Sequence, residues 1–300
     1  MQISRMDLAD KGSPEGIVMA ILKAEPNLPI PVPIEELCRQ LDIIEIQALT
    51  TQGFEGGLLT DRERSHGIIL VKKGVSPQRR RFTMGHELGH FLMPSHIPDE
   101  EGRFLCSQSD MALLKPKEGD RRAKMEVEAN RFSSLILMPP PALRTEIGKK
   151  SAPSLEHMLS LAMKFDVSKD AMARAYAEYH SETIAFVVVR DGKVLRNYRN
   201  KIRFPYITAL SGKAVPERSL FYRKGLQIGV PSDVDTRLPE NWIDVERGRQ
   251  APTMSEQVYL QSNGFALIML WYEPADDPDY DEDGERTAKE RLKHRQSRYT

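Results

Sequence analysis

The sequence is poor in the features that mark secreted and membrane proteins. It holds 2 cysteines in 300 residues, Cys38 and Cys106, which excludes a disulfide framework and suits a reducing compartment. Its longest apolar runs, AFVVV (185–189) and FALIML (265–270), have the length of strands and fall far short of a membrane span. The amino terminus, MQISRMDLAD, lacks the apolar core of a secretion signal. We therefore expect a cytoplasmic protein with no membrane segment.

The sequence also lacks an excess of charge of either sign. Lysine plus arginine and aspartate plus glutamate number 43 each, so no overall basic field of the kind that draws proteins to nucleic acids is present. With 40% hydrophobic and 29% charged residues, the composition is that of an ordinary soluble globular protein. A chain of this length can form two domains, or one domain with a large appendix.

Changes of pattern divide the chain into four parts. Residues 1–150 carry predicted helices and short strands, and residues 151–180 continue as a helical segment. Residues 181–272 are rich in strands, whereas 273–300 are acidic and then basic with little apolar surface to bury, which predicts a disordered tail. The predicted fold class is α+β. Helices plus a small antiparallel sheet come first, then a helix-turn-helix-like segment, then a β-rich α/β accessory domain.

Turn residues predict three hairpins. EGGLLT (55–60) and HGIILVKK (66–73) are separated by a polar, turn-sized link. Further along the chain, apolar segments flank Asp191-Gly192 and Ser262-Asn263-Gly264, which are strong turn signals.

The stretch RFTMGHELGHFLMPSH (81–96) concentrates three of the seven histidines. Ser76 followed by Pro77 is a typical helix start, and Pro94 ends the helix after Met93. The histidine-rich stretch is therefore predicted to lie on a helix.

His86-Glu87-Leu88-Gly89-His90 is the motif HExxH. Residues four apart share one helical face, so both imidazoles can reach one zinc ion. Glu87 is rotated by about 100° from His86 by helix geometry, which places it beside the ion. There it can act as the general base toward the attacking water of a metalloendopeptidase.

The alternative is a chance match on a solvated helix face. Apolar neighbours argue against it, because they indicate a partly buried helix: Phe82, Leu88, Phe91, Leu92 and Met93. Gly85 and Gly89 cost helix stability relative to alanine. Close approach of another backbone, or of substrate, would account for them.

A zinc hydrolase needs a third protein ligand. His96 is one candidate, at the HExxHxxGxxH spacing, but Met93 stands where that motif needs glycine, so an exposed loop histidine is the favoured interpretation of His96. The other candidates are Glu126 and Glu128 on a predicted helix over 120–138, with Asp120 as its cap. Helix geometry alone does not separate these two glutamates.

The sequences of the two predicted helices that carry the candidate metal ligands together resemble a known family. FTMGHELGHFLM, followed about forty residues later by EVEANRFSSLILMP, is similar to the pattern of the ImmA/IrrE-type metallopeptidases, a HELGH helix and then E-x-E-A-N-x-F-A-x-x-L-L-M-P. The similarity covers roughly residues 15–180. Ser133 replaces the usual alanine and Ile136 stands where leucine is common, and neither is a proposed ligand.

The resemblance implies a full set of site residues. Glu126 would be the third ligand with His86 and His90, and Glu87 would be the general base. Asn130, one turn after Glu126, would support a ligand or pack between the helices. One Zn²⁺ ion is the expected cofactor, and another divalent metal such as Mn²⁺ is the alternative.

The resemblance also implies a substrate. Characterised members of the family cleave helix-turn-helix (XRE-type) transcriptional repressors and so derepress stress-response or mobile-element genes. The residues by themselves lead to zinc-dependent peptide hydrolysis, with an extended substrate pairing along the edge of the strand HGIILVKK (66–73). The alternative is a DNA- or partner-binding transcriptional regulator with a structural or vestigial zinc site.

Residues 155–179 have the rhythm of a helix-turn-helix, with FDVS as the turn. DNA binding is the weaker interpretation, because the second helix offers only Lys169 and Arg174 to read bases. The favoured interpretation is a helical pair packed on the protease core. For residues 181–272, the resemblance implies a sensor-like domain.

Cys106 lies between the two metal helices in the sequence. We interpret it as a small buried side chain. The alternative is a thiol that reaches the zinc as a latch or senses oxidation.

Overall fold

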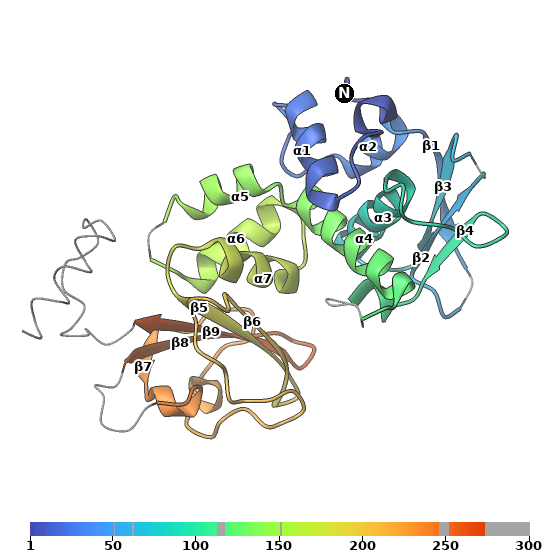
Figure 1. Cartoon of the computed structure of the whole chain (residues 1–300). Coiled ribbons are helices and arrows are strands. Elements are labelled where there is room, and N and C mark those ends of the chain that lie inside the picture. Colours follow the sequence, from blue (N-terminus) through green and yellow to red (C-terminus); the bar gives the residue numbers. More distant parts are fainter. Residues whose placement is uncertain (51, 62, 113–117, 151, 246–251, 274–300) are drawn as a thin grey trace, which may run out of the picture. The chain divides into compact units, whose positions relative to one another are not determined.

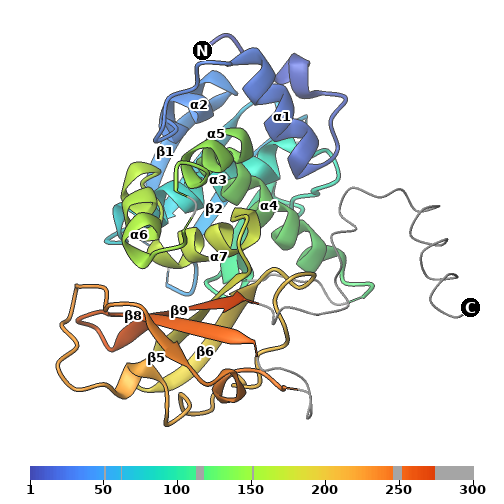
Figure 2. The same ribbon diagram turned by 90° about the vertical axis from the view of Figure 1, so that its left-hand side faces the viewer.

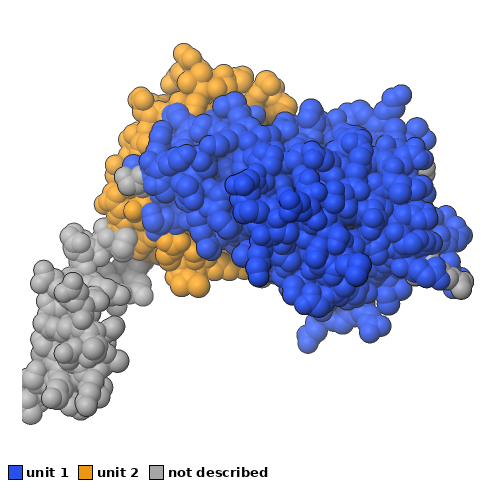
Figure 3. Space-filling view, turned by 90° about the horizontal axis from the view of Figure 1, so that it is seen from above, with its two compact units in different colours: residues 1–181 blue, residues 182–300 orange. Residues whose placement is uncertain are grey.

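The computed structural model describes residues 1–50, 52–61, 63–112, 118–150, 152–245 and 252–273. The predicted tail lies outside these residues, apart from Glu273. The chain divides into two compact units, Met1–Ser181 and Glu182–Thr300 (Figure 3). Each unit is described by itself below.

Unit 1 holds all the α-helices of the described residues. Serine or aspartate caps begin most of them, as the side chain of Ser76 accepts from the backbone N–H of Arg79 and that of Asp120 accepts from Ala123. Both caps were predicted. The helices are α1 Pro14–Ala24, α2 Ile34–Gln40, α3 Pro77–Leu92, α4 Arg121–Leu137, α5 Pro140–Ile147, α6 Leu155–Lys164 and α7 Lys169–Tyr179. Short 3-10 helices form at Arg5–Leu8 and Asp110–Ala112.

A four-stranded sheet accompanies these helices. Its strands are β1 Ile43–Leu49, β2 Gly56–Thr60, β3 Gly67–Lys72 and β4 Arg103–Cys106, in the order β1-β3-β2-β4. The predicted β2–β3 hairpin is confirmed, with Leu58 opposite Ile69.

The predicted small antiparallel sheet is confirmed for the pairs β2–β3 and β2–β4, whereas β1 pairs with β3 in parallel. The hairpin folds β2 back along β3, so β3 lies in the sheet interior with β1 on its other side. The proposed substrate edge on β3 is therefore wrong. Within the described sheet, the edge strands are β1 and β4.

Helix α3 forms the centre of unit 1. It packs on β2 and β3 on one side and on α4 on the other (Figure 1). Two glycines allow the close approach of α4: a Cβ on Gly85 would lie 3.3 Å from the Cα of Ser133, and one on Gly89 would lie 3.3 Å from the Cα of Ala129. The backbone that the glycines were expected to accommodate is thus that of α4.

The helix pair α6–α7 packs on the same unit through its turn. Asp166, in that turn, has a positive φ of 49° and accepts a hydrogen bond from Gln78 of α3 at 2.7 Å. Arg81 of α3 forms an ion pair with the same carboxylate at 3.2 Å. The turn is thereby tied to the helix that carries the HExxH motif.

Unit 2 is built on one antiparallel sheet (Figure 2). Its strands are β5 Ile184–Arg190, β6 Lys193–Arg199, β7 Asp235–Arg237, β8 Thr253–Leu260 and β9 Phe265–Glu273, in the order β6-β5-β9-β8-β7. The hairpins predicted around Asp191-Gly192 and Ser262-Asn263-Gly264 are confirmed. A core of apolar side chains centred on Trp242 covers one face.

The expected α/β character of unit 2 is wrong for its described residues, which contain strands and only two short 3-10 helices, Leu220–Tyr222 and Pro239–Asn241. The sequence between β6 and β8 contains few helix-forming runs and many prolines and glycines, which disfavours α-helices. Across the described part of both units, no helix has the length and apolar character that crossing a membrane requires.

Candidate metal centre

The two histidines of the HExxH motif face one point beside α3. Helix α3 is buried from Thr83 to Leu92, so the whole motif lies away from solvent. The Nε2 atoms of His86 and His90 are 3.1 Å apart. That is the separation expected for two nitrogens that share one metal ion, since tetrahedral ligands at about 2.0–2.1 Å stand about 3.3 Å from one another.

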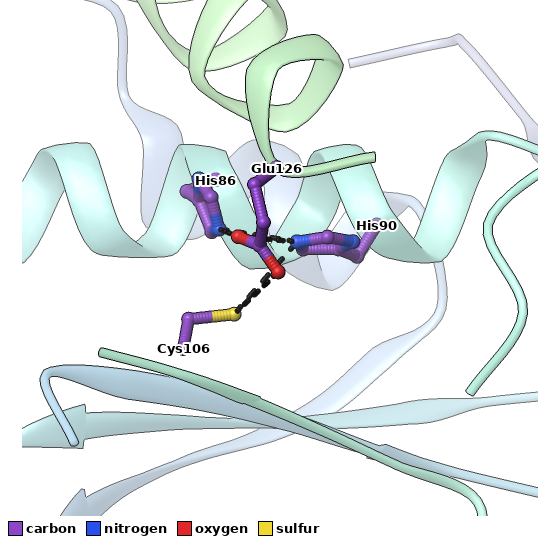
Figure 4. Close-up of side chains that lie close together, drawn as sticks. All are labelled: His86, His90, Cys106 and Glu126. Atoms are coloured by element: carbon purple, nitrogen blue, oxygen red, sulfur yellow. Dashed lines mark hydrogen bonds and ion pairs between the residues drawn. The ribbon is translucent and has the colours of Figure 1, made fainter. Parts of the chain in front are cut away.

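Glu126 reaches the same point from α4 (Figure 4). Its Oε2 lies 3.2 Å from Nε2 of His86 and 3.5 Å from Nε2 of His90. Glu128, two residues further along α4, points elsewhere and contacts His96 at 3.1 Å. The structure therefore separates two glutamates that helix geometry left equivalent.

Cys106 supplies a fourth group from β4, on the side of the cluster away from α4 (Figure 4). Its Sγ lies 3.7 Å from Nε2 of His90 and 3.9 Å from Oε1 of Glu126. The sequence interpretation of Cys106 as a buried side chain is correct in its burial, but the thiol also faces the proposed ligands. Its strand was missed, because residues 103–106 are too few to show a clear pattern.

These four side chains fit a divalent metal ion. One ligand atom from each of His86, His90, Cys106 and Glu126 lies within 4.8 Å of the other three, and all four residues are buried. Two imidazoles, a carboxylate and a thiol are the donors that zinc takes. In addition, Glu87 Oε1 and Glu126 Oε2 are buried without a hydrogen-bond partner among the described residues, and a cation would compensate them.

Electrostatics separate the roles of the two glutamates. Burial raises the pKa of Glu87 well above its ordinary range, and the nearby charge of Glu126 raises it further. Burial also opposes the ionisation of Glu126, but contacts with His86 and His90 outweigh it and hold its pKa below the ordinary range. Burial lowers the pKa of His90 to about 3, which keeps its imidazole neutral, as metal ligation requires.

Asn130 holds the ring of His86. Its Oδ1 lies 2.9 Å from Nδ1 of His86, and its Nδ2 donates to the backbone carbonyl of Asp110 at 2.9 Å. With Nδ2 committed to Asp110, Oδ1 accepts from the Nδ1–H of His86. That tautomer leaves the Nε2 lone pair directed at the cluster.

His96 and Glu128 hold the ring of His90. Nδ1 of His96 lies 2.9 Å from Nδ1 of His90, and Nε2 of His96 lies 3.1 Å from Oε2 of Glu128. If Nε2 of His90 faces a metal, its Nδ1–H donates to His96, and the Nε2–H of His96 donates to Glu128. His96 is fully buried, so its interpretation as an exposed loop histidine is wrong. It lies behind a ligand and outside the four-residue cluster.

Comparisons with known proteins find similarity in the region of the chain that carries these residues. Residues 42–176 match the peptidase family M78, described as the IrrE N-terminal-like domain. The radiation response metalloprotease IrrE of Deinococcus radiodurans is 29% identical over 129 residues, which are 43% of this chain and 36% of that protein. IrrE of Deinococcus deserti is 28% identical over 123 residues, 41% of this chain and 40% of that protein. The similarity thus spans well under half the length of these relatives.

Among solved structures, a Mycobacterium tuberculosis transcriptional regulator aligns with 90% of this chain and 79% of its own, at a TM-score of 0.48 and 12% identity. That score is too low to establish a shared fold.

Proposed function

The chain belongs to the ImmA/IrrE-type family by the match over residues 42–176, and we propose that it is a metal-dependent endopeptidase. His86, His90 and Glu126 are the proposed metal ligands, and Glu87 is the proposed general base. The observation that carries the proposal is the buried ligand set with the unpaired carboxylate oxygen of Glu87 beside it.

Each side chain has a distinct part in peptide hydrolysis. A bound divalent ion would polarise the scissile carbonyl and make water more acidic. Glu87 removes the proton from the attacking water and passes it to the leaving amine. Burial makes the Glu87 carboxylate a stronger base than an exposed one, and the charge of a bound cation would keep it ionised until it takes the proton. Asn130 and His96 keep the two histidine rings in place.

Zinc is the proposed ion, because imidazole and carboxylate donors at these separations suit a tetrahedral site. The same donors bind Mn²⁺, and metal analysis of the purified protein distinguishes the two.

The proposed substrate is a helix-turn-helix (XRE-type) transcriptional repressor. Support comes from the family and from the two relatives, which are named radiation response metalloproteases and of whose length this chain covers 36% and 40%. An extended segment of the substrate would add as a strand to the sheet edge beside the metal centre, the edge that β4 occupies in this structure. Release of repressed stress-response genes in the cytoplasm would follow cleavage.

The test is Glu87→Gln in the metal-loaded protein. A quenched fluorescent peptide library and a purified XRE-type repressor serve as substrates. We expect the variant to keep one metal per chain and to lose cleavage by about 10²- to 10⁴-fold, the usual contribution of a general acid–base group. Cleavage at the wild-type rate by Glu87→Gln would exclude the mechanism.

A second candidate function is a DNA- or partner-binding regulator in which the site is structural. The approach of Cys106 favours it, since four protein ligands without an open position are typical of structural zinc. In that case wild type and Glu87→Gln would both bind metal and neither would cleave. A salt-sensitive band shift with DNA would identify the regulator.

A further inference from the structure

Cys106 has a position that the family ligand set does not explain. We infer that its sulfur is a fourth metal ligand, which closes the centre and keeps the peptidase latent until β4 withdraws. The ligation itself stands on the geometry, whereas the latency rests on the proposed function.

The printed distances from Cys106 to His90 and to the Glu126 carboxylate are a little longer than those of one coordination shell. Sγ of Cys106 lies 3.7 Å from Nε2 of His90 and 3.9 Å from Oε1 of Glu126. For a zinc–sulfur distance of about 2.3 Å and zinc–nitrogen or zinc–oxygen distances of about 2.0 Å, a tetrahedron has edges of about 3.5 Å. The four ligand atoms lie within 4.8 Å of one another, so a single ion would contact all four groups once the widest separation closes by about 1 Å, and the thiol would give up its proton on binding.

The sulfur also lies where the attacking water belongs. That water must touch both the metal and the general base. Sγ lies 3.8 Å from Oε2 of Glu87, while Oε1 of the same fully buried carboxylate has no partner among the described residues. A thiol in contact with both the ligand set and Glu87 leaves no room for a water between them. Cleavage therefore requires that Cys106 leave.

Strand β4 has features that allow Cys106 to move away from the cluster. It is four residues long, lies at the edge of the sheet, and pairs with β2 alone. Cys106 stands opposite Gly56 in this pairing, and its carbonyl accepts from the N–H of Glu55 at 2.9 Å. Short edge strands open at a small fraction of the global unfolding free energy. Withdrawal of β4 therefore leaves the helices that carry the other ligands in place.

The second cysteine provides a matched control. Cys38 is also fully buried, but it lies on α2 and belongs to no metal-ligand group among the described residues. Removing Cys38 deletes a buried thiol of the same size without touching the metal centre.

The experiment uses the full chain loaded with one equivalent of Co²⁺, a spectroscopic substitute for zinc. Wild type and Cys38→Ala are expected to show the near-ultraviolet charge-transfer band of a cobalt–sulfur bond, and Cys106→Ala is expected to lose it. In the zinc-loaded proteins, Cys106→Ala is expected to cleave the peptide library faster than wild type, whereas Cys38→Ala cleaves at the wild-type rate. Circular dichroism checks that each variant is folded.

The outcomes separate this inference from the proposed function. A wild-type spectrum without the band, at full cobalt occupancy, excludes Cys106 as a ligand even if the protein is a peptidase. A band that Cys106→Ala abolishes, with no cleavage by any variant, establishes the ligand and excludes the peptidase and its latency. A band together with equal cleavage by wild type and Cys106→Ala excludes the latency.

Discussion

At the scale of single residues, the side chains that hydrogen-bond to the proposed ligands would set the affinity of the centre for an ion. His90 rests on His96, which rests on Glu128, at distances of 2.9 Å and 3.1 Å. This chain of hydrogen bonds fixes the tautomer of His90 and raises the basicity of its free nitrogen. None of these contacts requires His96 to touch the metal.

Replacing His96 with alanine should therefore weaken metal binding without changing the number of ions bound. Loss of a hydrogen-bonded supporter of a ligand costs about 10- to 100-fold in metal affinity. Competition with a chromogenic chelator measures this loss. His66→Ala is the control, because its side chain is half exposed and its ion-pair partner is Asp61, away from the cluster. An unchanged affinity in His96→Ala would show that the ring of His90 is held by its packing alone.

Residue types and their spacing in the sequence predicted part of the candidate metal centre but did not identify every group in it. The spacing of His86 and His90 follows from helix geometry and needs no further information. The choice of Glu126 over Glu128 depends on the rotation of α4 about its axis, which its contacts with α3 set. Cys106 depends on a pairing between β4 and β2 across the intervening α3, and no local pattern reports such a pairing.

At the scale of elements, the crossing of α3 and α4 places Glu126. The glycines of α3 let the α4 backbone approach, and the hydroxyl of Ser133 donates to the carbonyl of Phe82 at 2.8 Å. Ser133, where the family usually has alanine, thus bonds the two helices together. Helix ends were predictable because caps and prolines are local signals, whereas this crossing is a tertiary contact.

Gly85→Ala should destabilise unit 1 and weaken metal binding. The new Cβ would lie 2.6 Å from Oγ of Ser133, so either α4 shifts or Ser133 loses its hydrogen bond. Overpacking costs about 1–3 kcal/mol, which exceeds the gain of about 1 kcal/mol from better helix propensity. Urea unfolding followed by circular dichroism measures the difference.

Two further variants test the cause of that destabilisation. Gly12→Ala places a Cβ in open space and should leave stability unchanged. Adding Ser133→Ala to Gly85→Ala removes the closest contact and should restore part of the stability. Ser133→Ala alone measures the cost of losing the hydrogen bond to Phe82. If the double variant recovers nothing beyond that cost, the Cα and Cβ of residue 133, both at 3.3 Å, cause the clash.

At the scale of the whole molecule, the two units carry different reporters. All α-helices of the described residues lie in unit 1, so the far-ultraviolet helical signal follows that unit. Both tryptophans of the sequence, Trp242 and Trp271, lie in unit 2, and Trp242 is fully buried in its core. Unfolding of each unit can therefore be followed separately in the intact chain.

Removal of the metal should lower the stability of unit 1 and leave that of unit 2 unchanged. An ion held by the proposed ligand set would stabilise the folded form of unit 1, and a ligand at 100 times its dissociation constant adds about 2.7 kcal/mol to the unfolding free energy. Treatment with a chelator is thus expected to shift the helical transition to lower urea concentration, while the tryptophan transition keeps its midpoint. His86→Ala, which loses a ligand, should show the lower helical midpoint with or without metal. Should both transitions move together on chelation, the two units unfold as one cooperative structure, and the metal centre stabilises the β-sheet unit as well.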